Sequence, residues 1–493
     1  MRTTTKFRLL LSIYLMETLI TMQYSTIITA ANDLVGGRAP MGLVLFAYSV
    51  PSILTRVIVP LSSFRDFDNI RFISRLIGRD PSDFASREFS ATISLSREVN
   101  YPLRLLVCAV SSFLGLQLLS IFSNIPTRVL GIMLAALSSN LGDMSFQMLC
   151  ARYPKASKWA FFGYTTGSGT AAVIGASYYT FVTSWMQWNY GWALSIVGVA
   201  PVLGGLCYAF ILPDPEDDVM LPNIKDQEKE GIVQLPWKDK LRIIRPMFVP
   251  YMLPLATIFF LEHCTTQGIF PTLLYYLPLD LHSFRFAKFF NRIFTESREF
   301  YPFYLTVNQA ANLIGRCSII FSPLPGGKTR STACYWTLTV VEGLVLAIQG
   351  ANSVSMTSSL TTTLYGPAGV LLLTFLGGAS AGIVFCNTYW KVMKLPLPPA
   401  VYKALDAARV RAGVAVTQGE EGIRLLDDIA PTLRERSATE DMALREFLLS
   451  AVAPPDVASV TIASLVGMGL QRGLCAWQVM NGRELCLRPV SGE

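Results

Sequence analysis

Long apolar stretches recur along the whole chain and constrain its fold more than any other feature of the sequence. A helix of about 20 apolar residues spans the hydrocarbon of a bilayer, which is roughly 30 Å thick. Lipid offers no partner to unpaired backbone groups, so a spanning segment must be helical or part of a closed barrel. The stretches of the 493-residue chain lie at 7–31, 40–62, 102–122, 127–151, 159–183, 192–212, 246–274, 300–321, 331–349, 365–390 and 443–470. They predict an all-α, polytopic membrane protein with about 11 transmembrane helices.

The composition and the motifs agree with a membrane protein that is not an enzyme. Hydrophobic residues make up 52% of the chain and charged residues 15%, whereas soluble domains contain about 25% charged residues. The net charge of +7 does not indicate a nucleic-acid partner, because lysine and arginine gather in particular loops. The nine cysteines include no CxxC pair and only two histidines occur, so we expect neither a metal site nor a cofactor. The motifs GxSxG, HExxH and GxxxxGKS/T are absent, which leaves ion coupling as the energy source for uphill movement.

The polar stretches divide the chain into two halves. Residues 1–212 form a first half with six predicted helices and a basic insertion at 63–101, which we expect to lie on the membrane surface. Residues 213–245 form a linker, and residues 246–470 form a second half with five predicted helices and a polar loop at 391–441. The predicted architecture is a major-facilitator-like bundle of two halves.

Positive charge is unevenly distributed between alternate loops. The N-terminus and the loops after the second, fourth, sixth, eighth and tenth stretches hold most of the lysine and arginine. The positive-inside rule therefore predicts a cytosolic N-terminus and a lumenal or external tail at residues 471–493. Cys475 and Cys486 are able to pair in a lumenal tail, but two free thiols are the interpretation that we favour.

The stretch Leu134–Pro154 places polar side chains in the middle of a predicted membrane helix. Asn140, Asp143 and Gln147 are spaced i, i+3 and i+7, so they share one helix face. A carboxylate near the bilayer midplane costs a few kcal/mol or more unless it faces protein, water or a partner charge. Asp143 is therefore a candidate binding residue for substrate or protons, and an interhelical hydrogen-bond clamp is the alternative. The Gly/Ser/Thr-rich segment Gly163–Ser177 follows, and its small side chains let another helix approach closely.

Two further acidic residues lie inside predicted helices, Glu17 in the first and Glu262 in the seventh. In a two-halved transporter the first, fourth and seventh helices line the central cavity, so both residues join Asp143 as candidates by analogy of fold. His263 and Gln267 follow Glu262, and a carboxylate beside a histidine at membrane depth suits a proton relay. A structural pair between Glu262 and an arginine of another helix is the alternative.

A second amide-rich face occurs in the eighth stretch. Gln309, Asn312 and Arg316 are spaced i, i+3 and i+7, and the guanidinium group of Arg316 suits a carboxylate or phosphate. Snorkelling to the cytosolic headgroups is the alternative for Arg316, and it is the interpretation that we favour for Arg56. Further acidic candidates with less supporting context are Glu342 and Asp456.

The 391–441 loop contains a candidate targeting motif. Its residues EGIRLL, with Glu421, Leu425 and Leu426, fit an acidic-dileucine signal that cytosolic sorting adaptors bind. The predicted topology puts this loop on the cytosolic side. Because the motif is short, an amphipathic helix with the same residues is the alternative.

Six stretches of the sequence are distinctive in their order and spacing. They are SSNLGDMSFQMLCARYPKA (Ser138–Ala156), GSGTAAVIGASYY (Gly167–Tyr179), VPYMLPLATIFFLEHCTTQGIF (Val249–Phe270), FYPFYLTVNQAANLIGRCSI (Phe300–Ile319), GGASAGIVFCNTYWKV (Gly377–Val392) and LREF (Leu444–Phe447). Together they resemble the battenin family of lysosomal and vacuolar membrane proteins. The 63–101 insertion, the 391–441 loop and the tail have no counterpart, and the family's glycosylation and C-terminal lipidation signals are absent.

The resemblance implies an eleven-helix, major-facilitator-like protein of lysosomal or vacuolar membranes. It implies a part in lumenal pH homeostasis and in the movement of basic amino acids such as arginine, or of glycerophosphodiesters. It places acidic family positions at Asp143 and Glu262 and a basic family position at Arg316.

The sequence as a whole predicts a proton-linked secondary transporter of small polar solutes in the membrane of an acidic organelle. We expect membrane lipids, a small polar solute and protons as its partners, with sorting adaptors on the cytosolic loops. The alternatives are a non-transporting membrane organizer of endolysosomal trafficking, which would act through those loops, and a nucleoside-type carrier.

Overall fold

The computed structural model describes most of the chain. The described residues are 3–35, 42–61, 101–153, 156–213, 237–279, 286–294, 297, 300–321, 328–356, 366–394, 397–416 and 438–485. Their regular elements are all helices and no strand occurs among them, so the predicted all-α class is confirmed. The sorting motif Glu421–Leu426 and all of the predicted surface insertion except Tyr101 lie outside the described residues.

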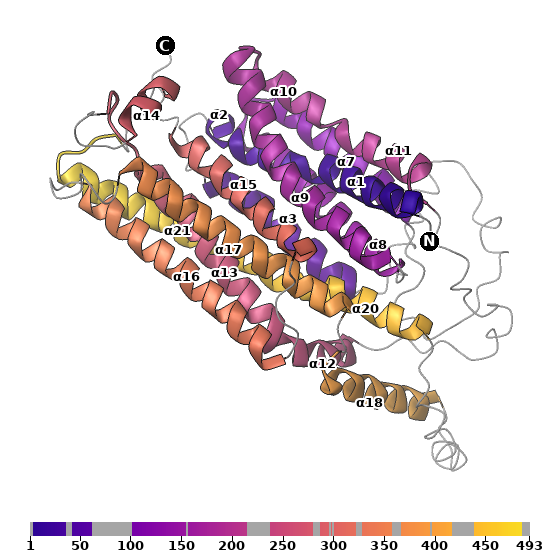
Figure 1. The fold of residues 1–493 in the computed structure, drawn as a ribbon. Coiled ribbons are helices and arrows are strands. Elements are labelled where there is room, and N and C mark those ends of the chain that lie inside the picture. Colours follow the sequence, from indigo (N-terminus) through magenta and orange to yellow (C-terminus); the bar gives the residue numbers. More distant parts are fainter. Residues whose placement is uncertain are drawn as a thin grey trace.

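The first half of the chain contributes long helices that run beside one another (Figure 1). They are α1 (Thr3–Thr29), α2 (Ala31–Val35), α3 (Gly42–Leu61), α7 (Tyr101–Ile121), α8 (Ile125–Ala151), α9 (Ser157–Thr180), the π-helical turn η2 (Phe181–Trp185), α10 (Tyr190–Val197) and α11 (Ala200–Phe210). Proline lies in the first turn of α8 and of α11, where the helix does not need the missing N–H group. The side chain of Asn189 caps α10 by accepting a 2.9 Å hydrogen bond from the backbone N–H of Gly191.

The second half begins with a long helical segment that changes its winding several times. In chain order it consists of α12 (Trp237–Met247), the π-helical turn η3 (Phe248–Met252), α13 (Leu253–Cys264), the π-helical turn η4 (Thr265–Ile269) and the 3-10 turn η5 (Phe270–Thr272). The later helices are α14 (Ala287–Ile293), α15 (Phe300–Phe321), α16 (Lys328–Ser355), α17 (Pro367–Lys394), α18 (Pro399–Val416), α20 (Ala438–Val452) and α21 (Pro454–Met480).

The last predicted apolar stretch is two helices in the structure. The chain leaves α20 at Val452 and starts α21 at Pro454, and the proline lies in the first turn, where the helix does not need its missing N–H group. Helix α21 continues to Met480, beyond residue 470, where the stretch was predicted to end. Arg445 of α20 donates hydrogen bonds to the backbone oxygens of Val392 and Met393, at 3.2 and 2.7 Å, and so fastens α20 to the end of α17.

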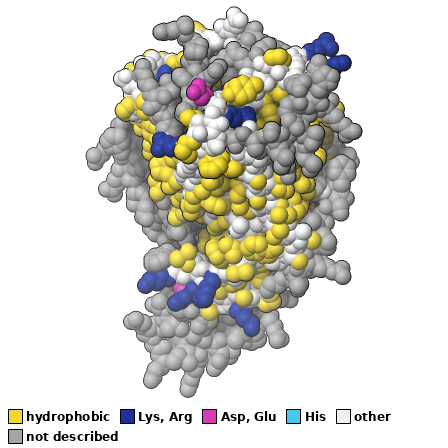
Figure 2. All heavy atoms as spheres, turned by 90° about the vertical axis from the view of Figure 1, so that its left-hand side faces the viewer, with side chains coloured by type: hydrophobic (Ala, Val, Ile, Leu, Met, Phe, Trp, Pro, Cys, Tyr) yellow, Lys and Arg dark blue, Asp and Glu magenta, His cyan; other side chains and the backbone are white. Residues whose placement is uncertain are grey.

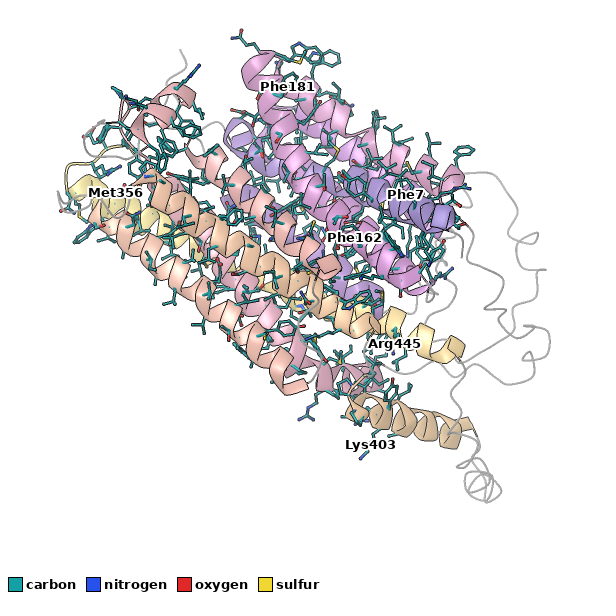
Figure 3. All side chains as sticks on the ribbon, viewed as in Figure 1. Phe7, Phe162, Phe181, Met356, Lys403 and Arg445 are labelled. Atoms are coloured by element: carbon teal, nitrogen blue, oxygen red, sulfur yellow. The ribbon has the colours of Figure 1, made fainter. Side chains whose placement is uncertain are left out.

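Three labelled side chains mark the two ends of the bundle in Figure 3. Lys403 of α18 and Arg445 of α20 lie toward one end, and Met356 lies at the opposite end. At the Met356 end, Gln478 of α21 donates hydrogen bonds to the backbone oxygens of Thr272 and Ser353, at 3.1 and 2.9 Å. The end of α21 is therefore tied to η5 and to α16.

One cysteine of α21 is not the free thiol that we favoured from the sequence. Cys475 is disulfide-bonded, so the expectation of a free thiol at this position is wrong. Cys486, the pairing partner that the sequence suggested, lies outside the described residues. The free cysteines of the described residues are Cys108, Cys150, Cys207, Cys264, Cys317, Cys334 and Cys386.

The described helices suit a membrane by their length and composition. Seven stretches are long and apolar enough to cross a bilayer: Tyr101–Ile121, Ile125–Cys150, Tyr190–Phe210, Lys238–Thr272, Thr332–Ser355, Pro367–Met393 and Phe447–Met480. Figure 2 shows hydrophobic side chains in a broad band across one face of the molecule, with lysine and arginine side chains above and below the band. The predicted number of eleven is not confirmed. Helices α1, α9 and α15 contain 27, 24 and 22 residues but are not in this set of seven, because they carry many polar side chains.

The two halves of the chain pack within themselves and against each other. In the first half α1 packs along α9 and α7 along α8, and in the second half α15 packs along α17 and α13 along α21. The helix pairs that join the halves include α9 with α15, α3 with α21, and α8 and α3 with α20. The predicted bundle of two halves therefore agrees with the contacts of the described helices.

Three hydrophobic clusters show where the halves share a core. The largest cluster draws on both halves and contains Leu9 of α1 and Phe161 of α9 together with Phe385 of α17 and Leu444 of α20. The buried residues of the second cluster all come from the first half, and those of the third all come from the second half. The halves are therefore joined by a common core at the end of the bundle that contains Leu9 and Leu444.

Glycines allow the close approach of α15 and α17. An added Cβ at Gly378 would overlap the backbone oxygen of Asn308, and an added Cβ at Gly382 would overlap that of Asn312. Because both contacts are with backbone, the neighbouring helix has no flexible side chain that could move aside.

We expect Gly382→Val to separate these helices and to lower the free energy of unfolding by about 1–3 kcal/mol, as overpacking does in other proteins. Thermal unfolding of the purified protein in detergent measures this loss as a lower melting temperature. Gly469→Val is the matched control, because a Cβ at Gly469 meets nothing within 4 Å. Equal melting temperatures for the two variants would contradict the close packing of α15 and α17.

Candidate functional site

The side chain of Arg56 points into the bundle and binds two residues of α8. Its Nη2 atom lies 2.6 Å from Oδ2 of Asp143, and its Nε atom donates a 3.1 Å hydrogen bond to Oδ1 of Asn140. Asn140 in turn donates a 2.6 Å hydrogen bond to the hydroxyl of Ser52 on α3. The predicted polar face of α8 is therefore the surface on which α3 docks. The favoured interpretation that Arg56 snorkels to headgroups is wrong, because its side chain is only 13% exposed.

Arg56 also reaches the second half of the chain. Its Nη1 atom lies 3.3 Å from Oδ1 of Asp456, near the start of α21. The hydroxyl of Tyr389 on α17 donates a 3.3 Å hydrogen bond to the other oxygen of Asp456. One guanidinium group thus holds two carboxylates, one from each half, and we call Arg56, Asp143 and Asp456 the arginine cluster.

Glu17 and Gln147 are buried beside the arginine cluster. Glu17 on α1 is 0% exposed, and its strongest charged neighbour is Asp143, followed by Arg316 and Arg56. Helix α1 lies close to α9 at this residue. A Cβ added to Gly167 of α9 would be only 3.0 Å from the Cβ of Glu17. Gln147, one turn after Asp143 on α8, is 1% exposed.

A second polar cluster lies between α13 and α15. Glu262 is 4% exposed, and its Oε1 atom accepts hydrogen bonds from the side-chain amides of Asn308 at 2.9 Å and Asn312 at 3.4 Å. Asn312 accepts a 2.7 Å hydrogen bond from Nε of Arg316. The same guanidinium group bonds Ser168 of α9 and lies 4.2 Å from the ring centroid of Phe385. We call Glu262, Asn308, Asn312 and Arg316 the amide cluster.

The structure separates the other predicted residues of α13 and α15 from this cluster. The Nδ1 atom of His263 lies 2.9 Å from the backbone oxygen of Phe259 on its own helix, so the ring is engaged one turn earlier rather than with Glu262. Gln267 is buried against α21, where a Cβ on Gly467 would come within 3.3 Å of its Cβ. Gln309 is half-buried on α15, and Asn308, one residue earlier, makes the contact with Glu262. The alternative for Glu262 was a structural pair with an arginine of another helix. Among the described residues, its hydrogen-bond partners are the two side-chain amides instead.

Helix α9 lies between the two clusters and touches both. The hydroxyl of Tyr164 donates a 2.9 Å hydrogen bond to Oδ1 of Asp143, and Ser168, one turn later, bonds Arg316. Gly163, Gly167 and Gly175 face α1 so closely that an added Cβ on any of them would overlap a backbone oxygen of that helix. The small residues of α9 therefore hold α1 against it, as their pattern predicted.

The arrangement provides groups for ionic recognition. No group of three or more His, Cys, Asp or Glu side chains that could hold a metal ion occurs among the described residues. What the two clusters offer is guanidinium groups, carboxylates and amides in a buried setting where water is scarce, so that each charge interacts strongly with its neighbours. Such groups bind small polar or ionic ligands and hold helices in place.

These features define a multi-pass, all-helical membrane protein with buried ionic groups between two halves. The family model described as CLN3 protein matches residues 88–230 and 219–477, which is most of the chain. This chain belongs to the CLN3 protein family. The predicted resemblance to the battenin family is confirmed.

Curated relatives match over almost the whole chain. Protein BTN1 of Mycosarcoma maydis is 25% identical over 98% of this chain and 89% of its own length. Protein btn1 of Schizosaccharomyces pombe is 25% identical over 94% of this chain and 93% of its own length.

Solved transporter structures show only weak similarity to this chain. A bacterial homologue of the human lysosomal transporter Spinster gives a TM-score of 0.44 at 14% identity, covering 97% of this chain and 99% of its own. The proton:xylose symporter XylE, of the major facilitator superfamily, gives a TM-score of 0.45 at 12% identity, covering 94% of this chain and 95% of its own. Scores below 0.5 carry no functional conclusion.

Several contact residues were not found from the sequence. Tyr164, Ser168 and Tyr389 are hydroxyl-bearing residues in otherwise apolar or small-residue segments, and no spacing rule distinguishes them from packing residues. Asn308 lies one position from the predicted Gln309. It could have been found by requiring that the face containing Asn312 include position 308, four residues earlier.

Removing the guanidinium group of Arg56 ought to be costly, because Asp143 and Asp456 would remain buried without their cation. We expect Arg56→Met to lower the free energy of unfolding by about 3–5 kcal/mol. Thermal unfolding in detergent measures this loss, and adding Asp143→Asn and Asp456→Asn to Arg56→Met restores most of it.

Arg242→Met is the matched control for this prediction. Arg242 pairs with Asp239 at 2.9 Å, but its side chain is 58% exposed, so its loss costs no more than about 1 kcal/mol. If Arg56→Met were as mild as Arg242→Met, the arginine cluster would not hold the halves together.

Proposed function

We propose that this protein is a proton-linked secondary transporter that moves a small polar solute by alternating access. The observation that carries the proposal is the buried ion pair between Arg56 of the first half and Asp456 of the second. A buried pair that served stability alone could be replaced by apolar side chains without loss. An ion pair between two packed bodies can instead break and re-form as those bodies rotate against each other.

The shared hydrophobic core supports a state that is closed on the cytosolic side. Leu9 and Leu444 belong to that core and lie near segments that the positive-inside rule assigns to the cytosol. Arg56 is five residues from Leu61, the last residue of α3, or about 8 Å along the helix. In this proposal, opening toward the cytosol breaks the bond between Arg56 and Asp456. The bond between Arg56 and Asp143 stays intact within the first half.

Arg316, Glu17 and Glu262 are the residues that contact the solute in this proposal. Arg316 supports this assignment because it extends from α15 to α9 across the boundary between the halves. A basic amino acid such as arginine would direct its carboxylate to Arg316 and its cationic groups to Glu17 or Glu262. A glycerophosphodiester would direct its phosphate to Arg316. The family resemblance supports these two solute classes.

The membrane that we propose is that of a lysosome or vacuole, where the transporter contributes to lumenal pH homeostasis. The family resemblance supports this location. The disulfide bond of Cys475 supports a lumenal C-terminal end, because disulfides persist in oxidising compartments and not in the cytosol. The N-terminus is then cytosolic, as the distribution of charge in the loops predicts.

Uptake into proteoliposomes under an imposed pH gradient tests the transport proposal, with radiolabelled arginine and glycerophosphocholine as probes. We expect Arg316→Lys and Glu262→Gln to reduce initial uptake at least about tenfold, because a hydrogen bond to a charged group contributes about 1.5–3 kcal/mol. Arg472→Lys, at an exposed position of α21, is the control.

Two outcomes would contradict the proposal in different ways. Unchanged uptake in both variants means that these residues do not contact the solute. Wild-type uptake no faster than in protein-free liposomes, with uridine as a nucleoside probe as well, rejects transport of these solutes and favours the membrane organizer.

The proposed orientation is tested by cysteine labelling in intact organelles, with the seven cysteines that are free among the described residues replaced by alanine. We expect Met480→Cys to react with a membrane-impermeant maleimide only after the organelles are permeabilised. Met480 is 75% exposed at the end of α21, so burial does not protect it. Lys403→Cys on α18 is expected to react in both conditions, and labelling of Met480→Cys in intact organelles would reverse the orientation.

A further inference from the structure

Helix α16 has an apolar face and a polar face. The exposed side chains Val340, Leu344 and Ile348 are 60%, 56% and 37% accessible, and they suit contact with lipid. The opposite face is buried and carries Thr339, Glu342, Gln349 and Ser353, which are 0–4% accessible. Polar groups inside a membrane bundle are costly unless they are hydrogen-bonded or paired. Thr339, Gln349 and Ser353 make hydrogen bonds within the protein.

Glu342 is the acidic residue of this stripe, and its carboxylate lies against a glycine. The side chain is 1% exposed, and its Oε2 atom has no hydrogen-bond partner among the described residues. A Cβ on Gly377 of α17 would lie 2.7 Å from Oε2 and 3.1 Å from Oε1. The missing side chain of Gly377 therefore makes the space that this carboxylate occupies.

Glu262 of the amide cluster is electrostatically linked to Glu342. Glu262 is the one charged group that acts appreciably on Glu342, and its own Oε2 atom also lacks a hydrogen-bond partner among the described residues. Asn308, which donates to Oε1 of Glu262, packs on Gly378, the residue after Gly377. Glu342 thus lies against Gly377, and Asn308, which bonds Glu262, lies against the next residue of α17, Gly378.

The other charged or titratable groups on helices that pack against α16 are engaged elsewhere. On α13, His263 is bonded to the backbone of Phe259. On α17, Lys391 lies over the ring of Tyr335, about 21 Å along the helix from Gly377. On α21, Asp456 is paired with Arg56, and Arg472 is exposed. The described residues of these helices therefore bring no cation to Glu342, whereas Glu262 shares Asn312 with Arg316 of α15.

Asp143 is in the opposite situation. It accepts hydrogen bonds from both Arg56 and Tyr164, so each of its two oxygens has a donor. The Oε2 atom of Glu342 has no such donor among the described residues, and a proton on it removes a buried charge.

We propose that Glu342 and Glu262 form the proton-binding site of this transporter, with Glu342 as the residue that carries the proton. Binding converts the carboxylate of Glu342 into a carboxylic acid, and release returns the proton to water. Gln349 and Ser353 continue the polar face of α16 toward its Ser355 end, which is lumenal in the proposed orientation. Their side chains are polar groups between Glu342 and that end of the helix. The hydroxyl oxygens of Ser353 and Thr272 are hydrogen-bonded at 2.6 Å. The part that this site plays in transport rests on the proposed function. The binding of a proton by Glu342 does not.

Infrared difference spectroscopy of the purified full-length protein between acid and neutral buffer tests the site without any solute. We expect the wild-type protein to show a buried carboxylic-acid C=O band that titrates, and Glu342→Gln to lose it. Glu342→Asp should retain the band, and Asp143→Asn should leave it unchanged. If Glu342→Gln, folded as judged by its melting temperature, keeps the wild-type band, Glu342 does not carry the proton.

A transport measurement separates failure of this inference from failure of the proposed function. A gradient of about one pH unit supports about tenfold accumulation of arginine or glycerophosphocholine at one proton per solute. We expect Glu342→Gln to lose this accumulation while it still exchanges labelled for unlabelled solute. Accumulation as in wild type would overturn the inference and leave transport standing. Absence of wild-type transport would reject the function, and the infrared experiment would still decide the site.

Discussion

The structure depends on one constraint: a charge buried between membrane helices must meet a partner that removes most of its cost. Arg56 satisfies this constraint for Asp143 and Asp456 at once, and in doing so it connects the two halves, which also meet through hydrophobic contacts and the hydrogen bond from Arg316 to Ser168. The amide cluster satisfies it only partly, because the two amides of Asn308 and Asn312 bond one oxygen of Glu262. The fully compensated cluster suits a structural link, and the partly compensated one suits a site that exchanges a ligand.

Helix α9 gives the two clusters a common mechanical element. Its polar residues Tyr164 and Ser168 lie one turn apart, and they bond charged groups that belong to different halves. The glycines of α9 keep α1, and with it Glu17, close by. A movement of α9 along its axis therefore changes the surroundings of Asp143, Glu17 and Arg316 together, which no movement of α3 or α15 alone would do.

Much of the fold could be predicted from the sequence, because lipid imposes length and apolarity on every spanning helix. The face of α8 that carries Asn140 and Asp143 followed in the same way from helical periodicity. The direction of Arg56 did not, because a long side chain near a helix end can reach headgroups or a partner, and only the neighbouring helix decides. The choice between Asn308 and Gln309 failed for another reason. Neighbouring residues of a helix differ by about 100° in direction, and a segment with three amides does not determine which one faces Glu262.

The π-helical turns η3 and η4, which bracket the 12 residues of α13, have a consequence for Glu262. A π turn contains more residues than an α turn, and such turns are frequent at functional sites. If one residue passed from η4 into α13, the helix would rotate by about 100° relative to the chain beyond it. Glu262 would then leave Asn308 and face a different neighbour, although neither end of the segment would have to move. Winding, rather than tilting, is thus a second way in which this segment can change what its carboxylate touches.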